Sequence, residues 1–118
     1  MSWIKVEDTA RHHRKHRAAD LEGRGLWLCG LEFCAQYCTD GRISKTDLHE
    51  LFTGHSKHDL VTLAARLVSL GLWEDRGDHW LVHDYLDYQE SSDEIRRKRA
   101  ANVQRQKRFR DKGVTRDK

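Results

Sequence analysis

The residues whose chemistry most clearly indicates a function are the arginines and lysines near the C-terminus. A helix that carries many cations can neutralise several phosphates, with an affinity that depends on salt more than on sequence. Residues 91–118 hold eleven Lys and Arg against four Asp and Glu, a net charge of +7, which predicts binding to a polyanion. A merely solvated helical face is the alternative. The candidate phosphate-binding residues form two clusters: Arg96, Arg97, Lys98 and Arg99, then Arg105, Lys107, Arg108 and Arg110.

A second candidate set lies on one side of a helix predicted over residues 57–70. Ser56 and Asp59 predict the start of this helix, and Gly71 predicts its end. Its apolar residues fall on one side and its polar residues on the other. Such a polar face enters the major groove in helix-turn-helix proteins, so the candidate DNA contacts are Lys57, His58, Thr62, Arg66 and Ser69. Among these, Arg66 is the residue suited to a bidentate contact with guanine.

The rest of the chain is acidic. Residues 1–90 hold eleven Lys and Arg against fifteen Asp and Glu, a net charge of −4. Arg76 is a further candidate DNA contact in a predicted hairpin turn, but Asp75 and Asp78 flank it. A scaffold that binds another protein and does not read DNA sequence is therefore the alternative function.

The cysteines and histidines allow a zinc site as a weaker alternative. Cys34 and Cys38 are four residues apart, as are His12 and His16, and together they would supply four tetrahedral ligands. Against this, the sequence has no Cys-x-x-Cys, and cysteines in an apolar helix are common core residues. We therefore predict no metal and no cofactor. Glycine-rich phosphate loops, nucleophile elbows and His-Glu-x-x-His motifs are also missing, so we predict no catalytic residues and no enzyme activity.

The elements that must position these residues follow from hydrophobic periodicity, turns and caps. They are a strand over 3–6, a buried helix over 21–39, a short helix over 45–52 capped by Ser44 and Asp47, the helix over 57–70, a hairpin of 72–74 and 79–83, a linker over 84–89, and a last helix that Ser91 and Glu94 open. Two short helices followed by a hairpin are typical of a winged helix-turn-helix. The predicted fold class is α+β and mostly helical: a winged helix-turn-helix domain over 1–90 with a C-terminal extended basic helix over 91–118. This last helix has few apolar residues, so we expect it to fray until a partner orders it.

Several short segments, taken in order, also resemble a known family. They are Met1–Asp8, Gly25–Leu28, Thr39–Gly41, Leu67–Trp73 and His83–Gln89, followed by the arginine-rich tail. Over roughly residues 1–110 the chain resembles the N-terminal winged-helix domain of phage and prophage replication proteins, of the replication-initiator or replisome-organiser type. The resemblance implies DNA binding in replication initiation or its regulation. Family members often continue beyond the basic helix, whereas this sequence ends at Lys118, which puts in doubt a function that needs a partner-loading C-terminal domain.

The expected partner is duplex DNA, with a replisome or host protein as the alternative, and the oligomeric state stays open, a dimer included. No apolar stretch is long enough to cross a bilayer, so no membrane partner is expected. The N-terminus lacks the order of a signal peptide, and three cysteines in one apolar segment are not a disulfide framework. These features predict a protein of the bacterial host cytoplasm, associated with the nucleoid.

Overall fold

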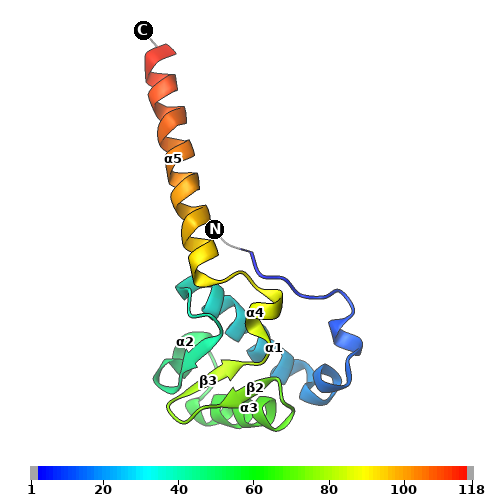
Figure 1. Ribbon diagram of the computed structural model, residues 1–118. Helices are drawn as coiled ribbons and strands as arrows, with labels where there is room; N and C mark the ends of the chain where they lie inside the picture. The colour runs from blue at the N-terminus through cyan, green and yellow to red at the C-terminus, as the bar shows by residue number, and fades with distance from the viewer. Residues whose placement is uncertain (1–2, 117–118) are drawn as a thin grey trace.

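Helices dominate the fold and pack around a small antiparallel sheet (Figure 1). The computed structural model describes residues 3–116, and the side chains of residues 3–111. The predicted fold class, α+β and mostly helical, is confirmed at this level. The first two residues of the resembling N-terminal segment and the last two of the basic tail lie outside the described residues.

Helix α1 (Arg14–Tyr37) is the longest element of the core, and a short 3-10 helix, η1 (Ala10–His12), precedes it. It starts earlier than the predicted residue 21 because the ring of His13 caps it, with Nδ1 accepting the Lys15 N–H at 3.2 Å. The helix is kinked at Asp20, whose φ of 63° is not helical. Its buried face packs against α3 and the sheet in one hydrophobic core.

The sheet has the order β1-β3-β2, with β1 (Arg42–Ser44), β2 (Trp73–Asp75) and β3 (His79–Val82). The predicted hairpin is confirmed as β2 and β3, in which Trp73 lies opposite Val82. Strand β1 was not predicted; its Ile43 lies opposite Trp80 and is fully buried. Three residues are too few to show an alternating pattern, and their partner strand lies far along the chain.

Between β1 and β2 the chain forms η2 (Lys45–Asp47), α2 (Leu48–Leu51) and α3 (Lys57–Ser69). The prediction for α3 is confirmed, and Ser56 Oγ accepts the Asp59 N–H at 3.1 Å as its N-cap. The predicted single helix over 45–52 is wrong, because it is divided into a 3-10 turn and one α turn. Ser44 is the last residue of β1, and its side chain makes no capping hydrogen bond to the helical segment that follows. Its hydroxyl lies 3.0 Å from Thr46 Oγ1.

The predicted strand over residues 3–6 is also wrong. This segment has no regular secondary structure and pairs with no strand, and Gln89 holds it with two hydrogen bonds: Lys5 N–H donates to Gln89 Oε1 at 2.8 Å, and Gln89 Nε2 donates to Lys5 O at 2.6 Å. The predicted linker over 84–89 contains a short helix, α4 (Tyr85–Tyr88). Tyr85 is buried there against Gly41, where a Cβ would lie 2.7 Å from the tyrosine.

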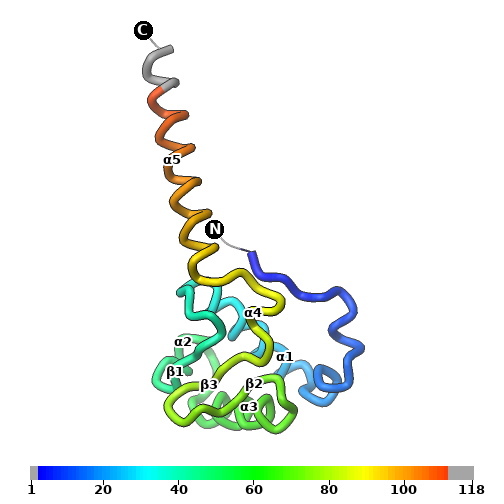
Figure 2. Tube along the Cα trace, in the orientation of Figure 1, coloured from blue at the N-terminus to red at the C-terminus, as the bar shows by residue number. Residues whose placement is uncertain are grey.

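Helix α5 (Ser92–Arg116) leaves the body at the end opposite α3, as the chain trace in Figure 2 shows. It gives the molecule its elongated shape, with extents of 62 × 30 × 25 Å. The capping pair predicted at its start is confirmed, because Ser91 Oγ accepts the Glu94 N–H at 3.3 Å and donates to the Glu94 carboxylate at 3.2 Å. Within the part of the chain that the structure describes, no helix is long and apolar enough to cross a membrane.

Candidate nucleic-acid interface

The first two turns of α5 are fixed to the body. Asp40, in the turn that follows α1, accepts both the Ser92 N–H at 2.6 Å and the Ser92 hydroxyl at 2.9 Å. One turn further on, the Ile95 side chain is only 4% exposed. A carboxylate at a helix N-terminus also opposes the positive end of the helix dipole. These contacts therefore set the direction of α5 relative to the body, and residues 92–99 are called the root of α5.

Arg99 attaches the root of α5 to the C-terminal end of α1. Its guanidinium donates to the carbonyls of Ala35 at 3.5 Å and Gln36 at 3.4 Å, which lie at the C-terminal end of α1. A cation at this position satisfies carbonyls that have no partner within the helix and opposes the negative end of the dipole. Arg99 was predicted to bind phosphate, and the structure places it at the junction of two helices.

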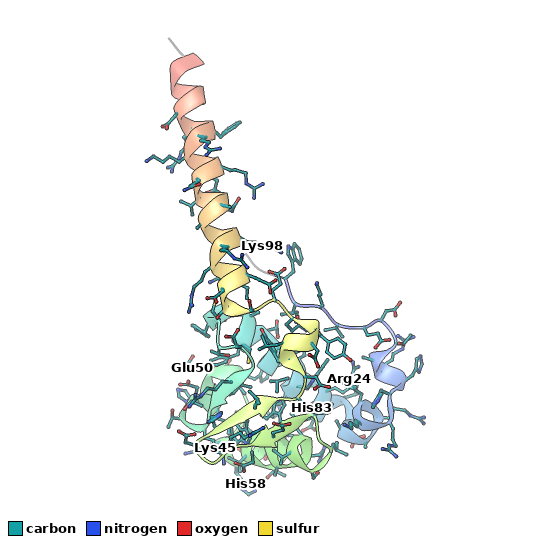
Figure 3. The ribbon with its side chains drawn as sticks, in the orientation of Figure 1. Arg24, Lys45, Glu50, His58, His83 and Lys98 are labelled. Carbon is teal, nitrogen blue, oxygen red and sulfur yellow. The ribbon has the colours of Figure 1, made fainter. Side chains whose placement is uncertain are left out.

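The other predicted cations of α5 divide into paired and unpaired residues. Lys98 forms an ion pair with Glu90, and Arg96 lies 3.9 Å from the Asp93 carboxylate. The remaining five lie beyond or beside the root, and their side chains are exposed (Figure 3). Among the described residues, no hydrogen bond or ion pair engages Arg97, Arg105, Lys107, Arg108 or Arg110. Their charge is available to a partner.

These cations surround α5 and do not form a single stripe. At about 100° per residue, residues eleven apart lie on nearly the same side of a helix, about 16 Å apart along its axis. Arg96 and Lys107 form one such pair, and Arg97 with Arg108 forms another on a different side. A helix with cations on several sides can contact the phosphates of both strands that border a groove.

The predicted contact face on α3 is open to solvent, and α5 does not cover it (Figure 1). Lys57 and His58 are exposed at its N-terminal end, and Figure 3 shows His58 pointing away from the body. The hydroxyls of Thr62 and Ser69 donate to carbonyls of their own helix, at 3.0 Å and 2.8 Å. The face therefore carries few groups without an internal partner.

Arg66, the predicted guanine contact, is engaged by α1. Its guanidinium donates to the Ala19 carbonyl at 3.3 Å and lies 3.9 Å from the Asp20 carboxylate. Ala19 and Asp20 form the kink of α1, where the backbone leaves helical geometry. Arg66 thus offsets the charge of Asp20 and hydrogen-bonds the backbone at the kink of α1. This is a structural role that the helical pattern of α3 did not indicate.

The hairpin turn holds its cations in the same way. Arg76 pairs with Glu74 at 2.6 Å, and Lys45 pairs with Asp75 at 2.9 Å. These hydrogen bonds are the main cause of the lowered pKa of both Glu74 and Asp75, so both carboxylates stay ionised at neutral pH. The tip therefore presents no net positive charge to a phosphate backbone.

The structure thus separates the two predicted sets. The basic set follows α5 at one end of the molecule, and the α3 face lies at the other end (Figures 1 and 2). A duplex that lies along α5 is out of reach of α3 within the same molecule. The α5 set is the denser of the two and the less engaged by the body.

The four residues of the zinc alternative do not form a metal site. Within the described part of the chain, no three His, Cys, Asp or Glu side chains are placed to hold a metal ion. His16 is buried, with its ring 4.4 Å from that of Trp27. Burial also raises the pKa of Cys34 to about 11, which opposes the thiolate that a metal requires.

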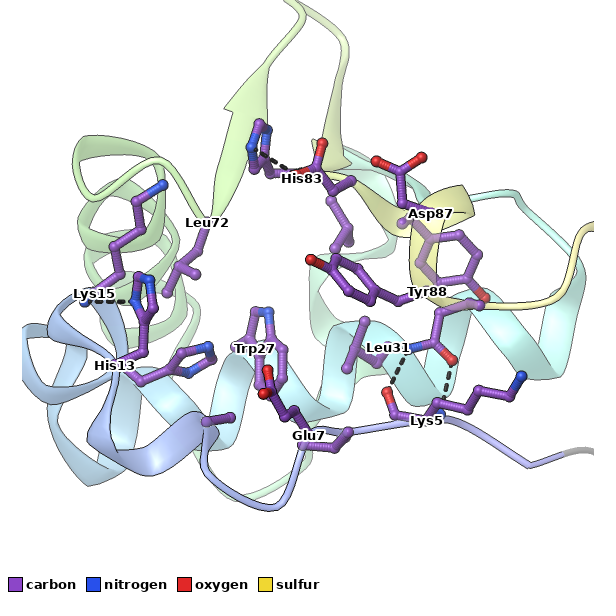
Figure 4. A pocket seen from close by; sticks show the side chains of 17 residues that line it. Lys5, Glu7, His13, Lys15, Trp27, Leu31, Leu72, His83, Asp87 and Tyr88 are labelled. Carbon is purple, nitrogen blue, oxygen red and sulfur yellow. Dashed lines mark hydrogen bonds and ion pairs between the residues drawn. The ribbon is translucent and has the colours of Figure 1, made fainter.

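An open cavity of about 890 Å³ lies between the N-terminal segment, α1, α4 and the base of the hairpin (Figure 4). Trp27 and Leu31 form part of its apolar wall, while Lys15 and Asp87 line its rim. Its ionisable groups carry both signs, so it does not favour an anion over a cation. We assign it no ligand.

Two pairs of residues in α5 and its root were missed at the sequence level. Asp40 and Ser92 are 52 positions apart, and no local pattern connects them. Asn102 and Gln106 lie inside the basic run with the i, i+4 spacing of a shared helix face. That spacing was a usable signal, which the surrounding charges obscured.

Comparison with known proteins yields no match: the chain matches no protein-family model, no curated protein and no solved structure. The resemblance to phage replication proteins stays a prediction from sequence segments.

Proposed function

We propose that this chain is a non-enzymatic DNA-binding protein of the winged-helix type, in which α5 is the principal DNA-binding element. One observation carries the proposal: α5 projects from an acidic body and presents cations that no described residue engages. An α-helix is about 10–12 Å across with its side chains, close to the major-groove width of about 12 Å. Duplex DNA is therefore the polyanion that this helix fits.

The order of the elements supports the winged-helix assignment. A long helix, a short strand, two helices and a hairpin follow one another, and the first strand pairs with the last one of the sheet. In this arrangement α3 takes the place of the recognition helix and residues 76–78 form the wing. Participation in phage replication initiation or its regulation is part of the proposal and rests on the sequence resemblance.

A protein partner for the body is the second candidate, and the pairing of its cations favours it. Arg66, Arg76 and Lys45 are all held by carboxylates of the body itself. The α3 face is therefore weakly equipped for phosphate, although it is exposed. In this alternative the α3 end contacts a replisome or host protein.

The salt dependence of duplex binding tests the proposal. Each phosphate contact contributes about 0.9 to the slope of log K against log salt concentration. Replacing Arg105, Lys107, Arg108 and Arg110 by Gln should therefore reduce that slope by about 2 to 4, as measured by fluorescence anisotropy with a labelled duplex. Glutamine keeps the helix propensity close to that of arginine and lysine.

The matched control replaces four exposed cations of the body outside the α3 face, Lys5, Arg14, Arg17 and Arg42, by Gln. It removes the same charge and should change the slope by less than about 1. If the control lowers the slope as much as the α5 variant does, α5 is not the principal element. If the wild-type chain does not bind duplex at low salt, DNA binding itself is excluded and the protein-partner alternative takes its place.

A further inference from the structure

One face of α5 carries two amide side chains that have no internal partner. Asn102 and Gln106 are exposed, and together with Arg105, Phe109 and Arg110 they line one shallow surface of the helix. At about 100° per residue, the two amides lie about 40° apart around the helix axis. No hydrogen bond joins either amide to another described residue. Exposed amides without a partner are free to bind a ligand.

The cations next to these amides lie on both sides of them. Measured from the direction midway between the two amides, Arg105 lies about 80° to one side and Arg110 about 60° to the other. In a helix that lies in a groove, side chains in the centre of the inward face meet base edges, and those on its flanks meet phosphates. The arrangement of α5 therefore places amides toward the bases and guanidinium groups toward the two backbones.

The chemistry of a side-chain amide matches one base. Its oxygen accepts and its NH₂ group donates, which complements the N6 donor and N7 acceptor of adenine in the major groove. Guanine presents two acceptors at this edge, so the amide oxygen would face an acceptor without a proton between them. Phe109 lies beside Asn102 on the same surface, where an apolar side chain can contact the methyl group of thymine.

The length of the exposed part of α5 fits this role. Residues 100–111 extend about 18 Å, which exceeds the major-groove width of about 12 Å. Four residues rise about 6 Å, close to two base-pair steps of about 3.4 Å each. Asn102 and Gln106 would therefore meet bases about two steps apart.

We propose that Asn102 and Gln106 read adenines through the major groove, and that α5 gives the protein a preference for sites with A·T pairs about two steps apart. This inference rests on the proposed DNA-binding function. It adds sequence recognition to a helix whose cations alone would bind any duplex.

Selection from a pool of randomised duplexes tests this inference with the full chain. Wild-type protein should enrich two adenines at a spacing of about two base pairs. The double variant Asn102→Ala with Gln106→Ala should lose that enrichment, and its affinity for the selected duplex should fall by about tenfold or more. Alanine favours helix more than asparagine does, so a loss is not explained by an unfolded α5, and circular dichroism checks this.

Gln104 provides the matched control. It is exposed on α5 about 180° from the direction midway between the two amides, so Gln104→Ala should keep both the selected motif and its affinity within about twofold. Affinity for an unselected duplex at low salt should be the same for wild type and both variants, because the cations remain.

The outcomes separate the two proposals. Duplex binding without any enrichment, or the same motif enriched by the double variant, overturns adenine recognition and leaves the DNA-binding function intact. No duplex binding at low salt overturns both. A parallel titration with an RNA hairpin distinguishes the remaining case, because tight binding to RNA alone also excludes duplex DNA as the target.

Discussion

At the scale of single residues, carboxylates engage several of the cations that the sequence offers for phosphate binding. Asp20 lies near Arg66 at the kink of α1, and Glu74 holds Arg76 at the hairpin. Exposed ion pairs contribute little to stability, but they reduce the charge available to a phosphate. The sequence shows arginines throughout the chain, but several of those in the body are engaged by carboxylates or carbonyls, whereas Arg105, Arg108 and Arg110 on α5 are not engaged by any described residue.

His16 gives this protein a stability that depends on pH. Its pKa lies below its usual value of 6.5, because burial and then the charge of Arg24 disfavour protonation. The unfolded chain binds the proton more readily, so the free energy of unfolding should decrease as the pH falls below 6.5 through the folded pKa. Urea denaturation at pH 7.5 and pH 5.5 measures this decrease.

The control for this experiment is His16→Gln, which keeps a polar side chain that does not titrate. The decrease between the two pH values should be smaller in the variant than in the wild type. An equal decrease in both proteins would show that other groups are responsible for the pH dependence. The carboxylates with lowered pKa, such as Glu74, act at lower pH and do not interfere.

At the scale of elements, two glycines of α1 show how differently one helix is used along its length. A Cβ at Gly30 would lie 2.8 Å from Trp73 Cζ2 and 3.2 Å from Ile43 Cδ1, whereas a Cβ at Gly25 would meet nothing within 4 Å. Gly30→Ala should therefore lower the free energy of unfolding by about 1–3 kcal/mol. Gly25→Ala should raise it by about 0.5–1 kcal/mol, because alanine loses less backbone entropy in a helix.

Chemical denaturation of both alanine variants against wild type measures the difference. Each variant is the control for the other, since the helix and the substitution are the same. Similar effects of the two substitutions would contradict the close packing of Gly30 on the hairpin tryptophan.

The elements that were predicted correctly are those with local signals. Ser56 and Ser91 each have an acidic residue three positions later, and the structure confirms a cap at both. The hairpin was also found because its turn lies between its two strands. Such signals depend only on groups that are neighbours in sequence, although the same spacing at Ser44 and Asp47 gave no cap, because Ser44 is the last residue of β1.

The elements that were missed depend on distant parts of the chain. Strand β1 exists because Ile43 pairs opposite Trp80, and the N-terminal segment is placed by Gln89 and forms no strand. Arg66 illustrates the same limit at the candidate site, because its role depends on a kink 46 positions earlier. The basic helix was identified at once from its charge, but the position of its root on Asp40 was not.

At the scale of the whole molecule, α5 consists of a packed root and an exposed rod. Truncation after Arg99 removes no buried described residue, so the free energy of unfolding should change by less than about 0.5 kcal/mol. Truncation after Glu90 also removes Ile95 and the Ser92 hydrogen bonds, and should lower it by about 2–3 kcal/mol. Urea denaturation of the two truncated chains checks this, and equal free energies of unfolding would show that the contacts of the root add no stability.

The single attachment of α5 makes it a lever. A helix of 25 residues is about 37 Å long, so a tilt of about 10° at its root moves its far end by about 6 Å. That distance is close to the spacing of two base pairs along a duplex. In the proposed DNA complex, a small change of angle at the hydrogen bonds between Asp40 and Ser92 would therefore shift the far turns of the helix along the duplex by about two base pairs.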